Sequence, residues 1–252
     1  MHGFANPARF LRIARWLTPL MLVTGLVLAG GALFWGVAVA PADALQGDTV
    51  RIIYLHVPTA WLGMAGWMAI AAASLTELVW RHPLAGIAAR ASAAPGAVFT
   101  AICLATGSLW GRPAWGAWWV WDGRLTSMLV LLFLYFGYMA LANAADADGQ
   151  GDNRIPAIFG LVGAVNIPII HYSVLWWNSL HQPPSITMGT SAMAPEFLIP
   201  LLVSTMGFTL LFGGIVLARM RAILANAQAE AQNYTFARYR NNIAALLGDL
   251  GI

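Results

Sequence analysis

Six stretches of the chain consist almost entirely of apolar residues, and short polar segments separate them. They cover residues 19–40, 58–80, 95–109, 125–142, 155–175 and 195–218. A helix needs about 20 apolar residues to cross a bilayer, and most of the six reach or approach that length. Several begin at or near a proline, which fits the first turn of a helix because no N–H is needed there. The pattern therefore predicts an all-α membrane protein with six transmembrane helices.

The basic residues are distributed unevenly between the two sides that these spans would separate. All thirteen are arginines, and all except Arg51, Arg112 and Arg124 fall on the side that holds both termini. Basic residues favour the cytoplasmic side of a membrane. We therefore expect both termini in the cytoplasm and three periplasmic loops, at 41–57, 110–124 and 176–194. The chain would form one six-span membrane domain, 1–218, followed by a cytoplasmic tail, 219–252.

Composition narrows the classes of function that fit this chain. Of its 252 residues, 60% are hydrophobic and 9% are charged, against about 25% charged residues in a soluble domain. The net charge of +3 is too small to favour nucleic-acid binding. The single cysteine, Cys103, allows no intrachain disulfide, no CxxC redox pair and no CxxCH haem-attachment site. The chain is therefore neither a disulfide exchanger nor itself a c-type cytochrome.

The second outer loop is unusually rich in tryptophan. Its sequence WGRPAWGAWWVWD, residues 110–122, holds five of the twelve tryptophans of the chain. An interfacial belt would explain one or two tryptophans at each helix end. The interleaved Gly111 and Gly116 would let the backbone approach a flat partner closely, and an aromatic platform would suit a large planar apolar ligand. Tryptophan density alone leaves both interpretations open.

The segment WGAWWVWDGRLTS, residues 115–127, resembles the WWD signature of the haem-handling protein family that includes CcmC, CcmF and CcsA. The following LVLLFLYFGYMAL, the six spans and the chain length resemble the CcmC branch, since CcmF-like proteins are much longer. The resemblance implies haem contacts from the loop, and from arginines that pair with the propionates. Asp122 could also cap the next helix. The implied haem-binding residues are Trp115, Gly116, Trp118, Trp119, Trp121, Asp122, Arg124 and, more weakly, Arg51.

Two histidines lie on the outer side, in the loops that flank the tryptophan-rich loop. His56 is in YLHVPTAW and His181 is in WWNSLHQPPS. Haem iron takes axial histidine ligands readily, and the matching residues of the resembled family are its haem ligands. The resemblance therefore implies non-covalent haem b held by both histidines. His171, about one turn below the outer surface, could be a metal ligand or a helix–helix contact.

The resemblance also implies a function in cytochrome c maturation. The chain would bind haem at the periplasmic face of the bacterial inner membrane and present it to the haem chaperone CcmE. Its other partners would be CcmD, the ABC transporter CcmA/CcmB and the lipid bilayer. It would be a transfer protein rather than a free-standing enzyme, with no catalytic residue. A haem-conducting channel, a CcsA-type haem–apocytochrome ligase and a haem-free docking module are the alternatives.

Overall fold

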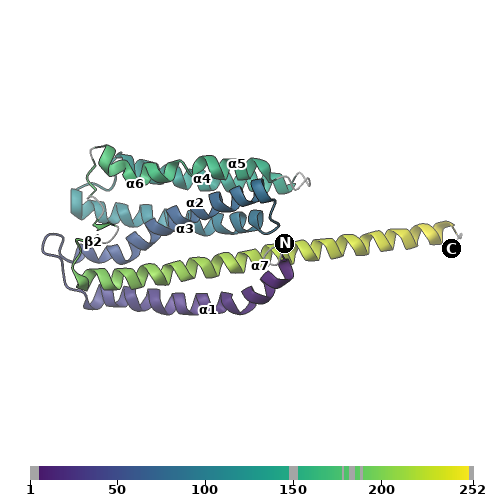
Figure 1. The fold of residues 1–252 in the computed structure, drawn as a ribbon, viewed down its shortest axis with the longest axis horizontal. Helices are drawn as coiled ribbons and strands as arrows, with labels where there is room; N and C mark the ends of the chain where they lie inside the picture. The colour runs from purple at the N-terminus through teal and green to yellow at the C-terminus, as the bar shows by residue number, and fades with distance from the viewer. Residues whose placement is uncertain (1–5, 148–152, 178, 182–184, 188–189, 250–252) are drawn as a thin grey trace.

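The computed structural model describes residues 6–147, 153–177, 179–181, 185–187 and 190–249, which are mostly helical (Figure 1). A π-helical turn, Trp35–Val39, extends α1, and a 3-10 helix, Asp48–Ile52, leads into α2. Two short antiparallel strands, β1 (Ile186–Thr187) and β2 (Thr190–Ser191), lie between the last two helices. The helices are α1 (Pro7–Phe34), α2 (Ile53–Trp80), α3 (Ala85–Trp115), α4 (Gly123–Ala147), α5 (Arg154–Gly163), α6 (Asn166–Trp176) and α7 (Pro195–Asp249).

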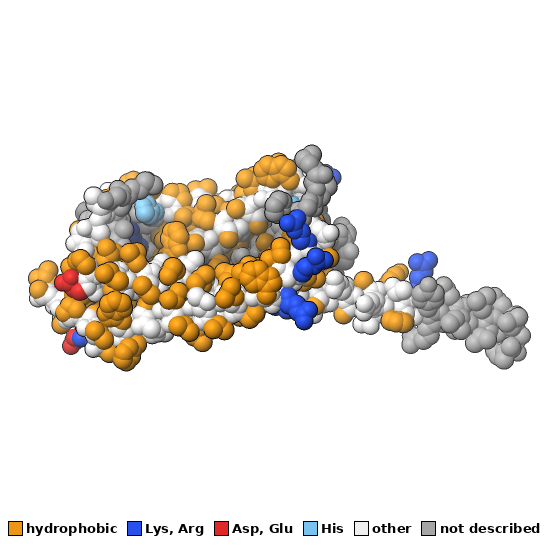
Figure 2. Space-filling view, turned by 60° about the horizontal axis from the view of Figure 1, so that its bottom comes forward, with side chains coloured by type: hydrophobic (Ala, Val, Ile, Leu, Met, Phe, Trp, Pro, Cys, Tyr) orange, Lys and Arg blue, Asp and Glu red, His pale blue; other side chains and the backbone are white. Residues whose placement is uncertain are grey.

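The described residues contain six segments that are long and apolar enough to cross a membrane, as the sequence predicts. They cover Pro7–Val39, Asp48–Trp80, Ala85–Trp115, Gly123–Asp146, Arg154–Trp176 and Pro195–Phe236. The protein is thus an all-α, multi-pass membrane protein. Most of the arginine side chains in view lie near the end of the bundle from which α7 projects (Figure 2). That end is the one expected to face the cytoplasm.

The proline-based helix starts are wrong for three of the spans. Pro19, Pro58 and Pro95 lie inside α1, α2 and α3, whereas Pro195 does begin α7. Interior prolines are tolerated in membrane helices because neighbouring groups can satisfy the freed backbone carbonyls. The third span is consequently 31 residues long. Its last turns contain residues 110–115, which the sequence pattern had assigned to the outer loop.

The fifth span is divided into two helices, which the hydrophobic pattern did not predict. Between α5 and α6, the Ile167 N–H donates to the Ala164 carbonyl, one residue nearer than in a regular α-helix. Pro168 follows at once, and a proline has no N–H to donate to a carbonyl four residues back. The break places the buried Asn166 at the start of α6, where its Nδ2 donates to the Ser127 carbonyl of α4 at 2.9 Å.

The helices form a bundle in which α1 and α7 lie side by side, while α4, α5 and α6 occupy the opposite side of α2 and α3 (Figure 1). Trp67 of α2 is fully buried in the centre, with its ring 5.0 Å from that of Tyr135. The Tyr135 hydroxyl donates to the Gly63 carbonyl at 2.7 Å. This packing joins α2 to α4 and supports the N-terminal ends of these two helices.

Candidate functional site

His56 lies in the first turn of α2 rather than in a loop, because α2 begins at Ile53. Its side chain packs against the C-terminal part of α3. The ring nitrogen Nδ1 is 3.0 Å from the Thr106 hydroxyl, and the ring meets the edge of Trp110 with centroids 5.6 Å apart. Gly107 makes room for it: a Cβ there would lie 3.0 Å from the imidazole Cε1. Helix α3 therefore fixes the position of this histidine from one side.

His181 is held by the residues at the start of α4. Its Nδ1 is 3.0 Å from the Asp122 Oδ2. The Ser179 hydroxyl donates to the same oxygen at 2.5 Å and accepts the His181 backbone N–H at 3.1 Å. The Trp115 ring meets the imidazole edge-on, with centroids 4.6 Å apart. The aspartate of the WWD segment is thus the partner of the second histidine.

Asp122 has two roles, one for each carboxylate oxygen. Oδ1 accepts the Leu125 N–H at 2.8 Å, so the expected helix cap is confirmed, while Oδ2 contacts His181 and Ser179. Burial would raise the pKa of Asp122, but the hydrogen bonds from Ser179, Leu125 and His181 outweigh it and lower the pKa. Burial lowers the pKa of His181 below its usual value, against the opposing effect of Asp122. At neutral pH an ionised carboxylate therefore faces a neutral imidazole.

The two histidines lie at the same end of the bundle, where both contact the C-terminal part of α3. Trp110 contacts His56 and Trp115 contacts His181. Five residues of α-helix advance about 7.5 Å along its axis, so the two contacts are close together. Within the described residues, Nε2 of each histidine has no hydrogen-bond partner, which leaves both lone pairs available to a ligand.

The remaining tryptophans of the loop do not form one continuous flat platform. Trp118 and Trp121 are 55% and 75% exposed, while Trp119 is half-buried and stands 5.4 Å from the Trp121 ring. The Trp119 Nε1 is buried without a partner in the described residues. Gly116 ends α3 with a φ of 77°, a left-handed conformation that favours glycine. The turn allows Trp115 to stay on the helix while the next tryptophans leave it.

The two candidate arginines are placed differently. Arg124, in the first turn of α4, donates from Nη2 to the His171 carbonyl at 3.3 Å, and its buried Nε has no partner in the described residues. Arg51 is paired with Asp48 at 2.9 Å and donates to the Val37 carbonyl in the π-helical turn after α1. The His171 side chain is exposed and its ring meets Tyr172 at 4.8 Å. Arg124 therefore has an uncommitted donor near the histidines.

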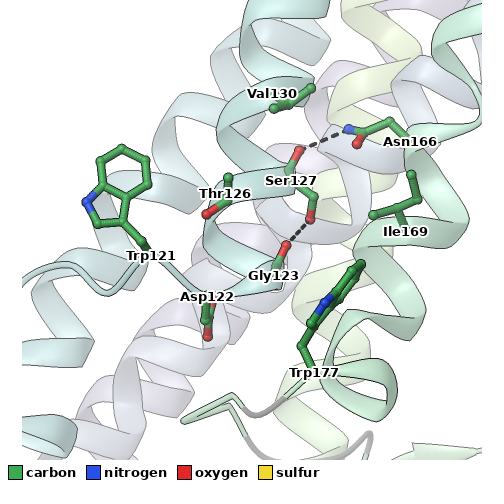
Figure 3. Close-up of a pocket in the computed structure, with 9 residues that line it drawn as sticks. All are labelled: Trp121, Asp122, Gly123, Thr126, Ser127, Val130, Asn166, Ile169 and Trp177. Atoms are coloured by element: carbon green, nitrogen blue, oxygen red, sulfur yellow. Dashed lines mark hydrogen bonds between the residues drawn. The ribbon is translucent and has the colours of Figure 1, made fainter.

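A groove of about 650 Å³ opens beside this site, between α4 and α6 (Figure 3). Trp121 and Asp122 of the WWD segment line it, together with Asn166 and Trp177. Trp177 lies against the start of α4, where a Cβ on Gly123 would be 2.8 Å from its ring. The WWD segment therefore borders one end of a groove that continues between α4 and α6.

Comparison with known proteins decides the family. Residues 1–235 match the family profile CcmC, described as "Heme exporter protein C". The chain belongs to the CcmC family. A "Heme exporter protein C" from Bradyrhizobium diazoefficiens is 51% identical over 86% of the chain and 82% of its own length. One from Escherichia coli K12 is 46% identical over 89% and 90%.

The relatives of this CcmC-family chain extend to a mitochondrial protein. A "Putative cytochrome c biosynthesis ccmC-like mitochondrial protein" from Marchantia polymorpha is 40% identical over 78% of the chain and 83% of its own length. The family match over residues 1–235 includes both histidines and the WWD segment. Thr106, Gly107 and Ser179, which sequence reasoning did not select, lie in the same region. Of these three residues, only Ser179 had a signal in the sequence, because it lies two residues before His181.

Proposed function

We propose that this CcmC-family protein binds haem between His56 and His181 at the outer end of the bundle and presents it for cytochrome c maturation. The observation that carries the proposal is the pair of histidines, each held through Nδ1 with Nε2 uncommitted. Two protein ligands are too few for a bare structural metal ion, which usually takes four, and the described residues contain no group of three or more metal-binding side chains. Two axial histidines suit an iron whose other ligands come from a porphyrin.

The surrounding residues fit a porphyrin of this kind. Trp110 and Trp115 each contact one histidine and would border the ring, while the exposed Trp118 and Trp121 would cover its periphery. The buried, unpartnered Nε of Arg124 is a donor suited to a propionate. Arg51 remains the weaker second candidate, because it would have to exchange its contact with Asp48. Haem b, bound without a covalent link, is the form that this arrangement supports.

The direction of transfer follows from the expected topology. The arginine-rich end would face the cytoplasm of a bacterial inner membrane, so the histidines would face the periplasm. A site at this position suits delivery to a periplasmic haem chaperone such as CcmE, in an assembly with CcmD and the CcmA/CcmB transporter. The packing of Trp67 against Tyr135 in the centre of the bundle favours presentation at one end over conduction through the spans.

The function is tested by comparing haem with metal-free protoporphyrin on the purified full chain in detergent. We expect haem to give a six-coordinate, low-spin spectrum. Metal-free protoporphyrin should bind at least about tenfold more weakly, which corresponds to about 1.4 kcal/mol of lost iron ligation. Equal binding of both would rule out iron ligation by the protein. Failure to bind either would contradict the haem-handling function at this site.

Replacing Gly107 with valine tests the position of His56. A Cβ at this position would lie 3.0 Å from the imidazole Cε1, and the valine methyl groups would push the ring away from the Thr106 hydroxyl. We expect haem affinity to fall about 10–100-fold, as for other changes behind a metal ligand. Ala105→Val is the matched control, because Ala105 is exposed on the same helix. An equal affinity in both variants would contradict this placement of His56.

A further inference from the structure

The two histidines differ in what holds their Nδ1 atoms. Nδ1 of His181 is hydrogen-bonded to the buried carboxylate of Asp122, whereas Nδ1 of His56 is hydrogen-bonded to the neutral hydroxyl of Thr106. Hydrogen bonds to an ionised group are roughly twice as strong as those between neutral groups. A carboxylate behind a histidine also makes the other ring nitrogen a more basic metal ligand. The chain therefore gives its two histidines different strengths as donors.

The carboxylate fixes both the tautomer and the orientation of His181. An ionised carboxylate only accepts hydrogen bonds, so the imidazole proton must be on Nδ1 and the lone pair on Nε2. Asp122 itself cannot turn freely, because Oδ1 is occupied by the Leu125 N–H at 2.8 Å. The Ser179 hydroxyl links the two residues, because it donates to Asp122 Oδ2 and accepts the His181 backbone N–H. The ring is thus held by Asp122, whose own position is fixed by hydrogen bonds from Leu125 and Ser179.

The Thr106 hydroxyl fixes the tautomer of His56, but unlike the Asp122 carboxylate it carries no charge. Thr106 has one hydroxyl proton, and it donates that proton to the Ile102 carbonyl at 2.7 Å. The hydroxyl oxygen must then accept from Nδ1–H of His56 at 3.0 Å. Nε2 again carries the lone pair, but the group behind the ring is neutral.

We propose that the two histidines are unequal iron ligands: Asp122, with Ser179, makes His181 the ligand that is retained, and His56 on Thr106 is the ligand that is released first. This proposal rests on the proposed function, in which haem is held between the two rings. A bis-histidine complex cannot be handed on until one ligand leaves. Unequal donors determine that the haem face toward His56 opens first, while His181 still holds the iron. Asp122, Ser179 and Thr106 are positioning residues in this scheme.

The Asp122→Asn variant tests the proposed stronger ligand, His181. An amide has one acceptor oxygen, and if that oxygen keeps the cap on Leu125, the NH₂ group faces His181 Nδ1. The proton of the imidazole must then move to Nε2, which removes the lone pair that would bind iron. We expect haem affinity to fall about 10–100-fold and added imidazole to restore the six-coordinate spectrum.

The Thr106→Val variant tests the proposed weaker ligand, His56. Thr106→Ser is the matched control, because it keeps the hydroxyl. Loss of one hydrogen bond between neutral groups should weaken haem binding only about 2–10-fold. The serine variant should match the wild type. If Thr106→Val weakens binding as much as Asp122→Asn, the two ligands are equal and the proposal is wrong.

Carbon monoxide gives a readout that a merely structural role would not change. Added to the ferrous, haem-loaded protein, it replaces one axial ligand, and its stretching frequency reports the ligand that stays. We expect the wild-type frequency to match that of His56→Ala and to differ from that of His181→Ala. A match to His181→Ala, or an equal mixture of both frequencies, overturns the proposal. A wild-type protein that takes up no haem instead contradicts the proposed function itself, which the porphyrin comparison identifies separately.

Discussion

Replacing both His56 and His181 with alanine is expected to leave the purified protein without haem. Each residue supplies an uncommitted Nε2 at the same end of the bundle. Changing a residue behind a metal ligand costs about 10–100-fold in affinity, so removal of both ligands should cost more than about 100-fold. The measurement is haem per protein after detergent purification, read from the absorption spectrum.

His171→Ala is the matched control for the double replacement. His171 is exposed on α6 and contributes its backbone carbonyl, not its ring, to the contact with Arg124. Its replacement should leave the haem content unchanged, and the protein should remain equally monodisperse in all variants. Haem retained by the double variant, or lost from His171→Ala, would show that the ligands have been assigned to the wrong residues. Single replacements should give five-coordinate spectra that added imidazole converts.

The number of spans was predictable because a membrane imposes a simple requirement on sequence. Every backbone group within the lipid must be satisfied inside the chain, so each crossing becomes a long apolar helix. The helix ends were less predictable. Hydrophobicity could not show that α3 continues to Trp115 or that α2 begins before His56. Prolines at helix interiors obscured the starts further, since proline is also common in a first turn.

The site was predictable in its residue types but not in its contacts. The local hydrogen bond from Leu125 N–H to Asp122 could be expected from a carboxylate directly before a helix. The contact between Asp122 and His181 joins residues 59 apart in sequence, and the contact between His56 and Thr106 joins residues 50 apart. Such pairs depend on how helices pack, which one sequence does not reveal. The structure also distinguishes the two candidate propionate-binding arginines, because Arg51 is paired with Asp48 whereas the buried Nε of Arg124 has no partner in the described residues.

Gly207→Val is expected to destabilise the whole protein by separating α1 from α7. A Cβ on Gly207 would lie 2.4 Å from the Ala29 backbone nitrogen, and a Cβ on Gly25 would lie 2.7 Å from that of Leu211. Small residues allow membrane helices to pack backbone against backbone, and a backbone cannot move aside as a side chain can. Overpacking costs about 1–3 kcal/mol or more, so we expect about 3 kcal/mol or more here.

The measurement is thermal unfolding of the detergent-solubilised protein, with Gly30→Val as the control. Gly30 is exposed on the same helix as Gly25, and a Cβ there would meet nothing within 4 Å. A loss of 3 kcal/mol should lower Tm by on the order of 6–12 °C for a chain of this size, while the control should keep its Tm. Equal Tm values for the two variants would mean that α1 and α7 are not packed through these glycines.

The same variant also connects helix packing to the haem site. Ser204 of α7 donates to the Tyr54 carbonyl at 2.6 Å, two residues before His56 in α2. If the clash displaces α7 along or across α2 rather than pushing α1 outward, this hydrogen bond is distorted and the first turn of α2 loses a support. Gly207→Val should therefore weaken haem binding through His56, and Gly30→Val should not. Since His181 is fixed by α4 and not by α7, the variant should retain a five-coordinate haem spectrum at temperatures below its reduced Tm.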